Sequence, residues 1–422
     1  MPTVESGPPP SPDLTKAFEI LLFKAAVEPV HLAVAFPRSP VDKADDWLPP
    51  AARPEAGRIA AGRGLTRKEA YLSCLGEAAE LASASFWGDE AVTRAKYSKV
   101  NRQALHPASL LCTSDAQYDQ RAHWNAVHGA FDWMPARFNE DEPIDWIEAT
   151  TPDKKTKIWV PAAYAYIGYF EAGDERAFAI ADSNGCAAGA SQEDAVIAAF
   201  LELVERDATA LWWYGRHPRP AFDQTGLQGA STLVASLADR RRNHHLLDLT
   251  TDLGIPVCAA ISFEPEGDAV AIGVSAHFDA SRAAVAALTE MLQIEFSLEM
   301  RKAAPIESND GFQFWLDAVR LQTMPHLLPA DRRKNELVSS LRGMPPTIQN
   351  CVRICHDAGL QFLMLDLTRP AIRVPAVRVI VPGLRTLRRR CGDGRLFDVP
   401  VRQGWCDTPQ AAEDLNVIPL SI

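Results

Sequence analysis

The chain has 422 residues, of which 43 are basic and 54 acidic, giving a formal net charge of −11. With 47% hydrophobic and 23% charged residues it can bury a sizeable core, which excludes disorder over the whole chain. Because it lacks an overall basic character, we expect it to bind neither nucleic acid nor anionic membranes. A local basic cluster near the end of the chain is interpreted as a solvated face, and it consists of Arg385, Arg388, Arg389 and Arg390.

The N-terminal segment is rich in proline and acid, and we predict a disordered leader over residues 1–13. It has neither the basic nor the apolar region of a signal peptide. The apolar stretch 18–36 is interrupted by three charged residues and a proline, so it cannot span a bilayer. We therefore expect a cytoplasmic protein. Residues 14–60 are predicted to form a short N-terminal region with an irregular connection, followed by one large domain over 61–422.

Helices and strands alternate along the rest of the chain without the regular spacing of a doubly wound sheet. Long helices are predicted over about 66–86, 191–214 and 280–302, and strands over 158–167, 176–181, 254–262 and 268–276. The last third adds a helix near 348–359 and two apolar strands after it. This pattern predicts an α+β fold with mixed or antiparallel sheets covered by long helices.

Two of the predicted helices repeat each other without a gap, at an offset of 125 residues. Gly64 aligns with Gly189, and each copy then opens with a predicted capping box, Thr66-x-x-Glu69 and Ser191-x-x-Asp194. Each copy also carries two glutamates three residues apart, which share one helix face. The pairs are Glu77 with Glu80 and Glu202 with Glu205. A looser third copy begins at Asp279 and places Glu290 and Gln293 at the same spacings.

The acids of the second copy lie on an unusually apolar helix. From Ala195 to Val204 every residue except Glu202 is apolar, which is typical of a buried helix. On a helical wheel Asp194, Glu202 and Glu205 share one arc. Carboxylates that converge in a buried place require cations, either arginine or a hard divalent ion such as Mg²⁺. Two other interpretations stay open: a Glu-x-x-Glu pair can simply face water, and Asp194 can be a capping residue only.

The segment before the second helix, 182–189, contains small residues and two glycines. Such a loop can bring backbone N–H groups close to a phosphate, although a plain strand-to-helix turn has the same composition. The chain contains no GxxxxGK[ST] motif, so this is not a P-loop.

Together these segments resemble the YcaO-domain family. The resemblance is carried by 183–216 and 62–80, with 366–384 and 413–420 adding to it. It implies a YcaO-like fold that binds ATP without a Walker motif, with acids holding Mg²⁺. The implied metal ligands are Glu77, Glu80, Asp194, Glu202, Glu205 and Glu290, and the implied ATP-binding residues are Glu77, Asn184, Glu202 and Arg206.

The resemblance also implies an activity: ATP-dependent O-phosphorylation of a peptide backbone amide. We expect an enzyme that cyclodehydrates Cys, Ser or Thr to azolines in a ribosomally synthesised peptide. One alternative is thioamide formation with a TfuA-like partner. The other is a non-catalytic, nucleotide-binding accessory subunit, which departures from the family pattern at Leu81, Ala190 and Ala286 motivate.

The expected partners also follow from the resemblance. A precursor peptide is the expected substrate. Because the resemblance begins near residue 55, we expect the leader peptide to be bound by a discrete partner, either E1-like or TfuA-like. A homodimer is possible. The C-terminal tail, with the single proline Pro419, only partly matches the proline-rich tail of cyclodehydratases.

Overall fold

The computed structural model describes residues 12–39, 48–129, 132–222, 227–303, 311–330 and 343–420. Most of the predicted leader therefore lies outside the described residues, and its last two residues, Pro12 and Asp13, begin a short helix. Part of the predicted irregular connection, 40–47, also lies outside them. Two 3-10 turns, Pro50–Ala52 and Pro54–Ala56, form much of the rest.

The helices of the described residues are α1 Pro12–Ala17, α2 Arg67–Ala84, α3 Tyr97–Val100, α4 Pro107–Leu111, α5 Asp115–Asp119, α6 Arg121–His128, α7 Ala162–Ala165, α8 Gln192–Gly215, α9 Ser231–Ala238, α10 Ala280–Ala303, α11 Gly311–Ala318, α12 Ile348–Asp357 and α13 Arg395–Arg402. The strands are β1 Phe18–Lys24, β2 His31–Pro37, β3 Ala60–Gly64, β4 Thr93–Ala95, β5 Ile144–Thr150, β6 Lys157–Pro161, β7 Cys186–Ala188, β8 Asn243–Asp248, β9 Val257–Phe263, β10 Ala271–Ala276, β11 Leu363–Asp366 and β12 Ala376–Ile380.

These strands form three antiparallel sheets, with orders β1-β2-β3, β10-β9-β8 and β4-β5-β11-β12-β7, and β6 joins the last by pairing with β5. The largest sheet combines strands from the middle of the chain with β11 and β12 from its last third. The predicted α+β fold with antiparallel sheets and long covering helices is confirmed.

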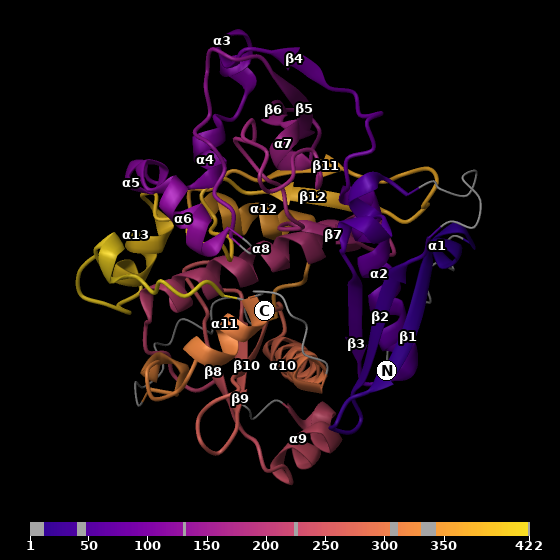
Figure 1. Ribbon diagram of the computed structural model, residues 1–422, viewed down its shortest axis with the longest axis vertical. Coiled ribbons are helices and arrows are strands. Elements are labelled where there is room, and N and C mark those ends of the chain that lie inside the picture. The colour runs from indigo at the N-terminus through magenta and orange to yellow at the C-terminus, as the bar shows by residue number, and fades with distance from the viewer. Residues whose placement is uncertain are drawn as a thin grey trace.

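The three long predicted helices, α2, α8 and α10, are all present and lie between the sheets. In Figure 1, α8 crosses the centre of the molecule, α2 stands beside the β1-β2-β3 sheet, and α10 lies below α8 next to β9 and β10. Both α2 and α8 contact β7 and β12, and both α8 and α10 contact β10. Because α8 is covered on most of its sides, its apolar composition is accounted for.

Two of the predicted strands differ from the structure. The first ends at Pro161, where α7 begins instead. The second, 176–181, is not a strand, because the backbone of Ala177 forms hydrogen bonds with Asp174 and Ala136 in loops rather than within a sheet. The sequence did not predict seven of the strands, β1, β2, β3, β4, β5, β7 and β8. Among the described residues, no helix combines the length and apolarity needed to cross a bilayer.

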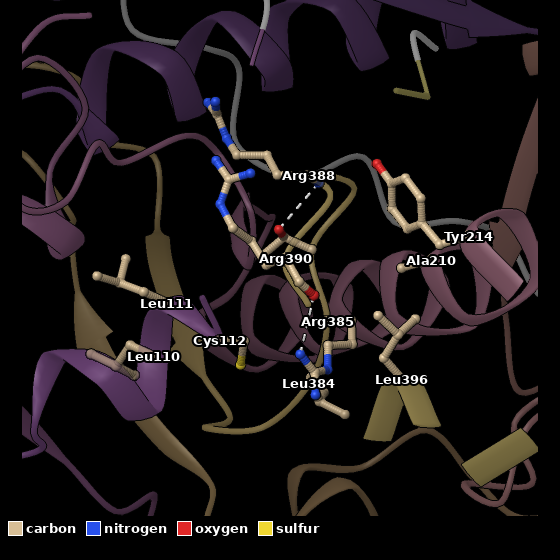
Figure 2. Close-up of a pocket in the computed structure, with 11 residues that line it drawn as sticks. Leu110, Leu111, Cys112, Ala210, Tyr214, Leu384, Arg385, Arg388, Arg390 and Leu396 are labelled. Atoms are coloured by element: carbon tan, nitrogen blue, oxygen red, sulfur yellow. Dashed lines mark hydrogen bonds between the residues drawn. The ribbon is translucent and has the colours of Figure 1, made fainter. Parts of the chain in front are cut away.

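The arginine cluster 385–390 is not the solvated face that its sequence suggests. Arg385 and Arg390 are buried and line a pocket together with Arg388 and Leu396 (Figure 2). Arg390 donates two hydrogen bonds to the carboxylate of Asp132, at 2.8 and 3.1 Å. These charges are accommodated inside because the carboxylate of Asp132, far away in the sequence, and the nearby loop carbonyls of Gly392 and Asp393 accept their hydrogen bonds.

Candidate functional site

The three repeated helices begin with the same cap. Thr66, Ser191 and Asp279 each accept a hydrogen bond from the backbone N–H three residues further on, at 3.2, 3.1 and 3.1 Å. Each cap satisfies an amide that has no partner inside its helix. The predicted third copy is therefore in register with the other two, and residues at equal distances from the caps take equivalent places.

The two predicted capping boxes differ in detail. At α2 the box is complete, because the Glu69 carboxylate also accepts from the backbone N–H of Thr66. At α8 the carboxylate of Asp194 instead accepts from the hydroxyl of Ser191, at 2.7 Å. The prediction of a reciprocal backbone bond at α8 is wrong, since the aspartate side chain is one carbon shorter than glutamate and bonds to the cap's side chain.

The aligned glycines before these helices serve the same purpose in both copies. A Cβ atom on Gly64 would lie 2.8 Å from the backbone N of Ala70, and one on Gly189 would lie 2.6 Å from that of Ala195. Both distances are too short for a real side chain, so only glycine lets the strand end approach the first helical turn. This close approach fixes where each helix, and hence each acid pair, stands.

Counting from the caps, three glutamates occupy equivalent positions: Glu77 on α2, Glu202 on α8 and Glu290 on α10. One helical turn further stand Glu80, Glu205 and Gln293. These acids interact electrostatically from helix to helix, Glu77 with Glu290, Glu80 with Glu202, and Glu205 with Glu290. The structure thus brings together five of the six predicted metal ligands.

Glu202 is anchored at both carboxylate oxygens. Its Oε2 accepts from the backbone N–H of Gly185, at 3.0 Å, and its Oε1 pairs with Nη2 of Arg206, at 2.5 Å. The loop 182–185 and α8 therefore fix the orientation of this carboxylate together. Arg206 also lies near Glu80, Glu205 and Asp182, so it serves as a shared counter-cation.

Glu290 is held in a similar way. Its Oε2 accepts from the backbone N–H of Val274 in β10, at 2.7 Å, and its Oε1 lies 3.4 Å from Nη2 of Arg63. Arg63, in β3, also donates to Oε1 of Gln293 at 3.4 Å. A residue that precedes the first repeat helix thus contacts both polar positions of the third.

Burial and mutual repulsion disfavour the charged state of the four acids on α2 and α8, Glu77, Glu80, Glu202 and Glu205. Burial, followed by neighbouring carboxylates, raises the pKa of Glu80 and of Glu205 well above the usual value. Burial raises the pKa of Glu202 to about 7 although Arg206 opposes the shift. Burial also raises the pKa of Glu77, against the effect of Arg63, although Glu77 is the most exposed of the five acids. A cluster of this kind is stabilised by added cations.

The carboxylates fit Mg²⁺ as part of a nucleotide complex. Within the described ranges, no side chain forms a hydrogen bond or ion pair with the carboxylates of Glu77, Glu80 or Glu205. In the same ranges, no three His, Cys, Asp or Glu side chains converge tightly enough to hold a metal ion alone. Mg²⁺ is usually bound through one or two carboxylates together with phosphates, rather than by an all-protein cage. Hard oxygen donors spread over three facing helices suit that mode.

Two buried polar atoms beside the acids also have no partner in the described part of the chain, Oδ1 of Asn184 and Nε of Arg206. Asn184 is only 5% exposed, so an unsatisfied oxygen there is costly unless a ligand supplies a donor. Both residues were predicted to bind ATP, and the structure places them next to the acid cluster through Gly185 and Glu202.

Asp194 is the predicted ligand that the structure does not bring to the others. It is exposed, it caps α8 together with Ser191, and it precedes Glu202 by eight residues. At 1.5 Å per residue this separates the two by about 12 Å along the helix axis. Its carboxylate makes no contact with the other acids among the described residues.

Sequence reasoning missed Arg63, Asp182 and Arg378. Asp182 has a lowered pKa, because Arg388, Arg206 and Arg378 outweigh its burial. Arg378 is a single arginine within the fully buried strand β12, and a charge in such a strand is a sequence signal for a buried polar role. Arg63 gave no comparable signal, since only the packing of β3 against α10 brings it to Glu290.

One family model and several known proteins are similar to this chain. A family model described as YcaO cyclodehydratase, ATP- and Mg²⁺-binding, matches residues 61–385. Among solved structures, a heterocyclase in complex with substrate and cofactor is 34% identical, with a TM-score of 0.84 over 95% of this chain and 54% of that chain. The heterocyclase TruD is 35% identical, with a TM-score of 0.74 over 85% of this chain and 51% of that chain. The chain thus spans about half the length of these two proteins.

More distant similarities extend to other proteins. The fold resembles that of the E. coli microcin synthetase McbBCD complex with pro-MccB17 bound, at 12% identity and a TM-score of 0.60 over 88% of this chain and 89% of that one. An uncharacterized protein of Methanothermobacter thermautotrophicus is 26% identical over 79% of this chain and 84% of its own. An uncharacterized protein in the tfuA 3′ region of Rhizobium leguminosarum bv. trifolii is 28% identical over 57% of this chain and 61% of its own.

Proposed function

Because the chain belongs to the YcaO family, which binds ATP and Mg²⁺, we propose that it uses ATP to activate a peptide backbone amide by O-phosphorylation. The proposed outcome is cyclodehydration of Cys, Ser or Thr to an azoline in a ribosomally synthesised peptide. The observation that carries the proposal is the meeting of five carboxylates from α2, α8 and α10 around Arg63 and Arg206. The likeness to two heterocyclases above 30% identity supports the same class of reaction.

The proposed reaction balances without an external oxidant or reductant. The thiol or hydroxyl of the reacting residue adds to the preceding carbonyl carbon and loses its proton. The resulting oxyanion takes the γ-phosphoryl group of ATP, and ADP leaves. The amide nitrogen then loses its proton, the C–O bond breaks with release of phosphate, and a C=N bond forms within the ring that the first addition closed. The net change in the peptide is the loss of one water, whose oxygen ends in phosphate.

In this proposal the protein contributes positioning and charge. Glu77, Glu80, Glu202, Glu205 and Glu290 would hold Mg²⁺, which when bound offsets the negative charge of the phosphates. The bonds to Glu202 and Glu290 from backbone N–H groups keep these carboxylates oriented before nucleotide arrives, so little reorganisation is needed. The side-chain oxygen of Asn184, which has no partner among the described residues, can accept a hydrogen bond from the nucleotide. The proposed metal role of Asp194 requires its side chain to leave Ser191.

Thioamide formation remains the second candidate. Its support is the similarity to the protein of the tfuA 3′ region, which matches 57% of this chain. Sulfide would then replace the side-chain nucleophile while the phosphorylation step stayed the same. A peptide-binding partner is proposed for either reaction, because the fold resembles that of the microcin synthetase McbBCD complex, which is a complex with pro-MccB17 bound.

Mass spectrometry of a precursor peptide encoded beside the gene, coexpressed with this protein and its neighbours, tests the proposal. Loss of one water per modified residue supports cyclodehydration, and exchange of a backbone oxygen for sulfur supports thioamidation instead. Coexpression with a Glu202→Gln variant is the matched control and should leave the peptide unmodified. A peptide modified equally by the variant would contradict the assignment of the site. ATP hydrolysis stimulated by peptide and partner would exclude a purely accessory subunit.

A further inference from the structure

A fully buried arginine stands directly behind the acid cluster. Arg378, in β12, is 1% exposed, and its guanidinium donates to the backbone carbonyls of Asn184 and Asp182, at 3.0 and 2.5 Å. Within the described residues no carboxylate forms an ion pair with it. Burying a charge is costly, and an apolar side chain of similar volume often serves packing as well or better. Packing alone therefore gives a weak reason for an arginine here.

The contacts of Arg378 converge on one loop, residues 182–185. The backbone of the neighbouring residue, Val379, also holds this loop, because its N–H donates to the carbonyl of Gly185 at 2.7 Å. Gly185 has φ +77°, and a Cβ atom there would lie 2.4 Å from the carbonyl oxygen of Val379. The loop is thus pressed against β12, and Arg378 bridges two of its carbonyls.

The same loop carries two features of the candidate site. The N–H of Gly185 orients Glu202, and Asn184 holds the buried oxygen without a partner in the described part of the chain. A shift of the loop would therefore misplace a carboxylate and a polar contact at once. A planar guanidinium can span two carbonyls in a fixed geometry, whereas a lysine ammonium on its flexible stem cannot reproduce that fork.

We infer that Arg378 is a positioning residue of the nucleotide site, which holds the 182–185 loop so that Gly185 and Asn184 face the nucleotide complex. This inference rests on the proposed function, because it assumes that the acid cluster binds Mg²⁺ and ATP. Charge on Arg378 also favours the approach of the negative loop residue Asp182, whose pKa it helps to lower. Arg378 itself need not touch the substrate.

A second buried arginine provides a matched control. Arg385 is 3% exposed and, like Arg378, donates to backbone carbonyls of a loop, those of Gly392 and Asp393 at 2.8 and 2.6 Å. Its loop lies beside α13 and not beside the acids. Replacing either arginine by methionine removes a buried charge and leaves loop carbonyls unpaired. Only at Arg378 should this change affect nucleotide binding.

The test measures binding of AMPPCP with Mg²⁺ by calorimetry to the full chain and to Arg378→Met, Arg378→Lys and Arg385→Met, with thermal unfolding recorded for each. Both Arg378 variants should bind at least about tenfold more weakly per folded molecule, as for other residues that orient metal ligands. Arg385→Met should unfold at a lower temperature and bind as wild type does. The lysine variant keeps the charge and most of the stem, so it decides the question if Arg378→Met does not fold.

The results separate this inference from the proposed function. If folded Arg378 variants bind the nucleotide as tightly as wild type, or if Arg385→Met weakens binding equally, Arg378 has no specific positioning role. If the wild-type chain itself does not bind AMPPCP with Mg²⁺, the proposed function fails before the variants are compared.

Discussion

Replacing Glu202 by glutamine isolates the charge of one carboxylate at the centre of the site. The glutamine keeps the shape of the side chain and one oxygen that can accept from Gly185, but it loses the negative charge that Arg206 and a metal ion would share. Charge-assisted interactions of this kind contribute about 1.5–3 kcal/mol each. At 1.4 kcal/mol for each factor of ten, nucleotide with Mg²⁺ should bind about 10- to 150-fold more weakly.

The same change should leave the fold almost unaffected. Glu202 loses an ion pair whose two side chains are each 22% exposed, but Arg206 keeps other negative neighbours, among them Glu205 and Asp182. Removing one of several mutually repelling acids offsets part of the loss. We therefore expect the free energy of unfolding without ligand to change by no more than about 1 kcal/mol.

Calorimetric titration with AMPPCP and Mg²⁺, beside denaturant unfolding, measures both quantities. Glu193→Gln is the matched control, since Glu193 is an exposed glutamate in the first turn of the same helix. It should bind nucleotide as wild type does. Unchanged affinity in Glu202→Gln, or an equal loss in Glu193→Gln, would refute the reasoning.

Three further predictions concern the fold and the limits of the site. Burial lowers the pKa of His326 to about 4, so below pH 6.5 the unfolded chain binds a proton that the folded chain does not. Between pH 7 and pH 5 the His326→Leu variant should therefore lose about 2 kcal/mol less stability than wild type, and equal losses in denaturant unfolding would contradict this. A Cβ atom on Gly273 would lie 2.2 Å from the backbone N of Met291. Gly273→Ala should therefore push α10 away from β10 and lower the free energy of unfolding by about 3 kcal/mol or more, and a melting temperature near that of wild type would be evidence against it. Asp194→Ala removes part of the α8 cap and should cost about 1 kcal/mol of stability. Calorimetry should show a smaller loss of nucleotide affinity for this variant than for Glu202→Gln, and an equal loss would make Asp194 a ligand in the bound state.

The parts of the site that could be predicted from sequence are those encoded by local spacing. Caps, glycines and acid pairs repeat at fixed distances along single helices, so the registers of Glu77, Glu202 and Glu290 followed from the sequence alone. The helical wheel also placed Asp194 on the same arc, but a wheel ignores distance along the helix axis. Asp194 lies in the first turn of α8, eight residues before Glu202.

What could not be predicted depends on contacts between distant segments. Arg63 meets Glu290 only because β3 packs near α10, and Arg378 meets the 182–185 loop only because β12 pairs with β7. The arginines near 390 were misjudged for the same reason, since their partner Asp132 lies far away in sequence. Strands β1 and β2 were missed because charged residues interrupt their apolar stretch, and pairing between them and with β3 decides their structure.

The central claim is that the oxygen of a peptide amide is transferred to phosphate. A precursor peptide that is modified on coexpression, synthesised with ¹⁸O in the reacting carbonyl and incubated with this protein, its partner, ATP and Mg²⁺, tests this claim most directly. Mass spectrometry should then find the label in inorganic phosphate, in step with modification of the peptide. Modified peptide with no label in phosphate would contradict activation by O-phosphorylation.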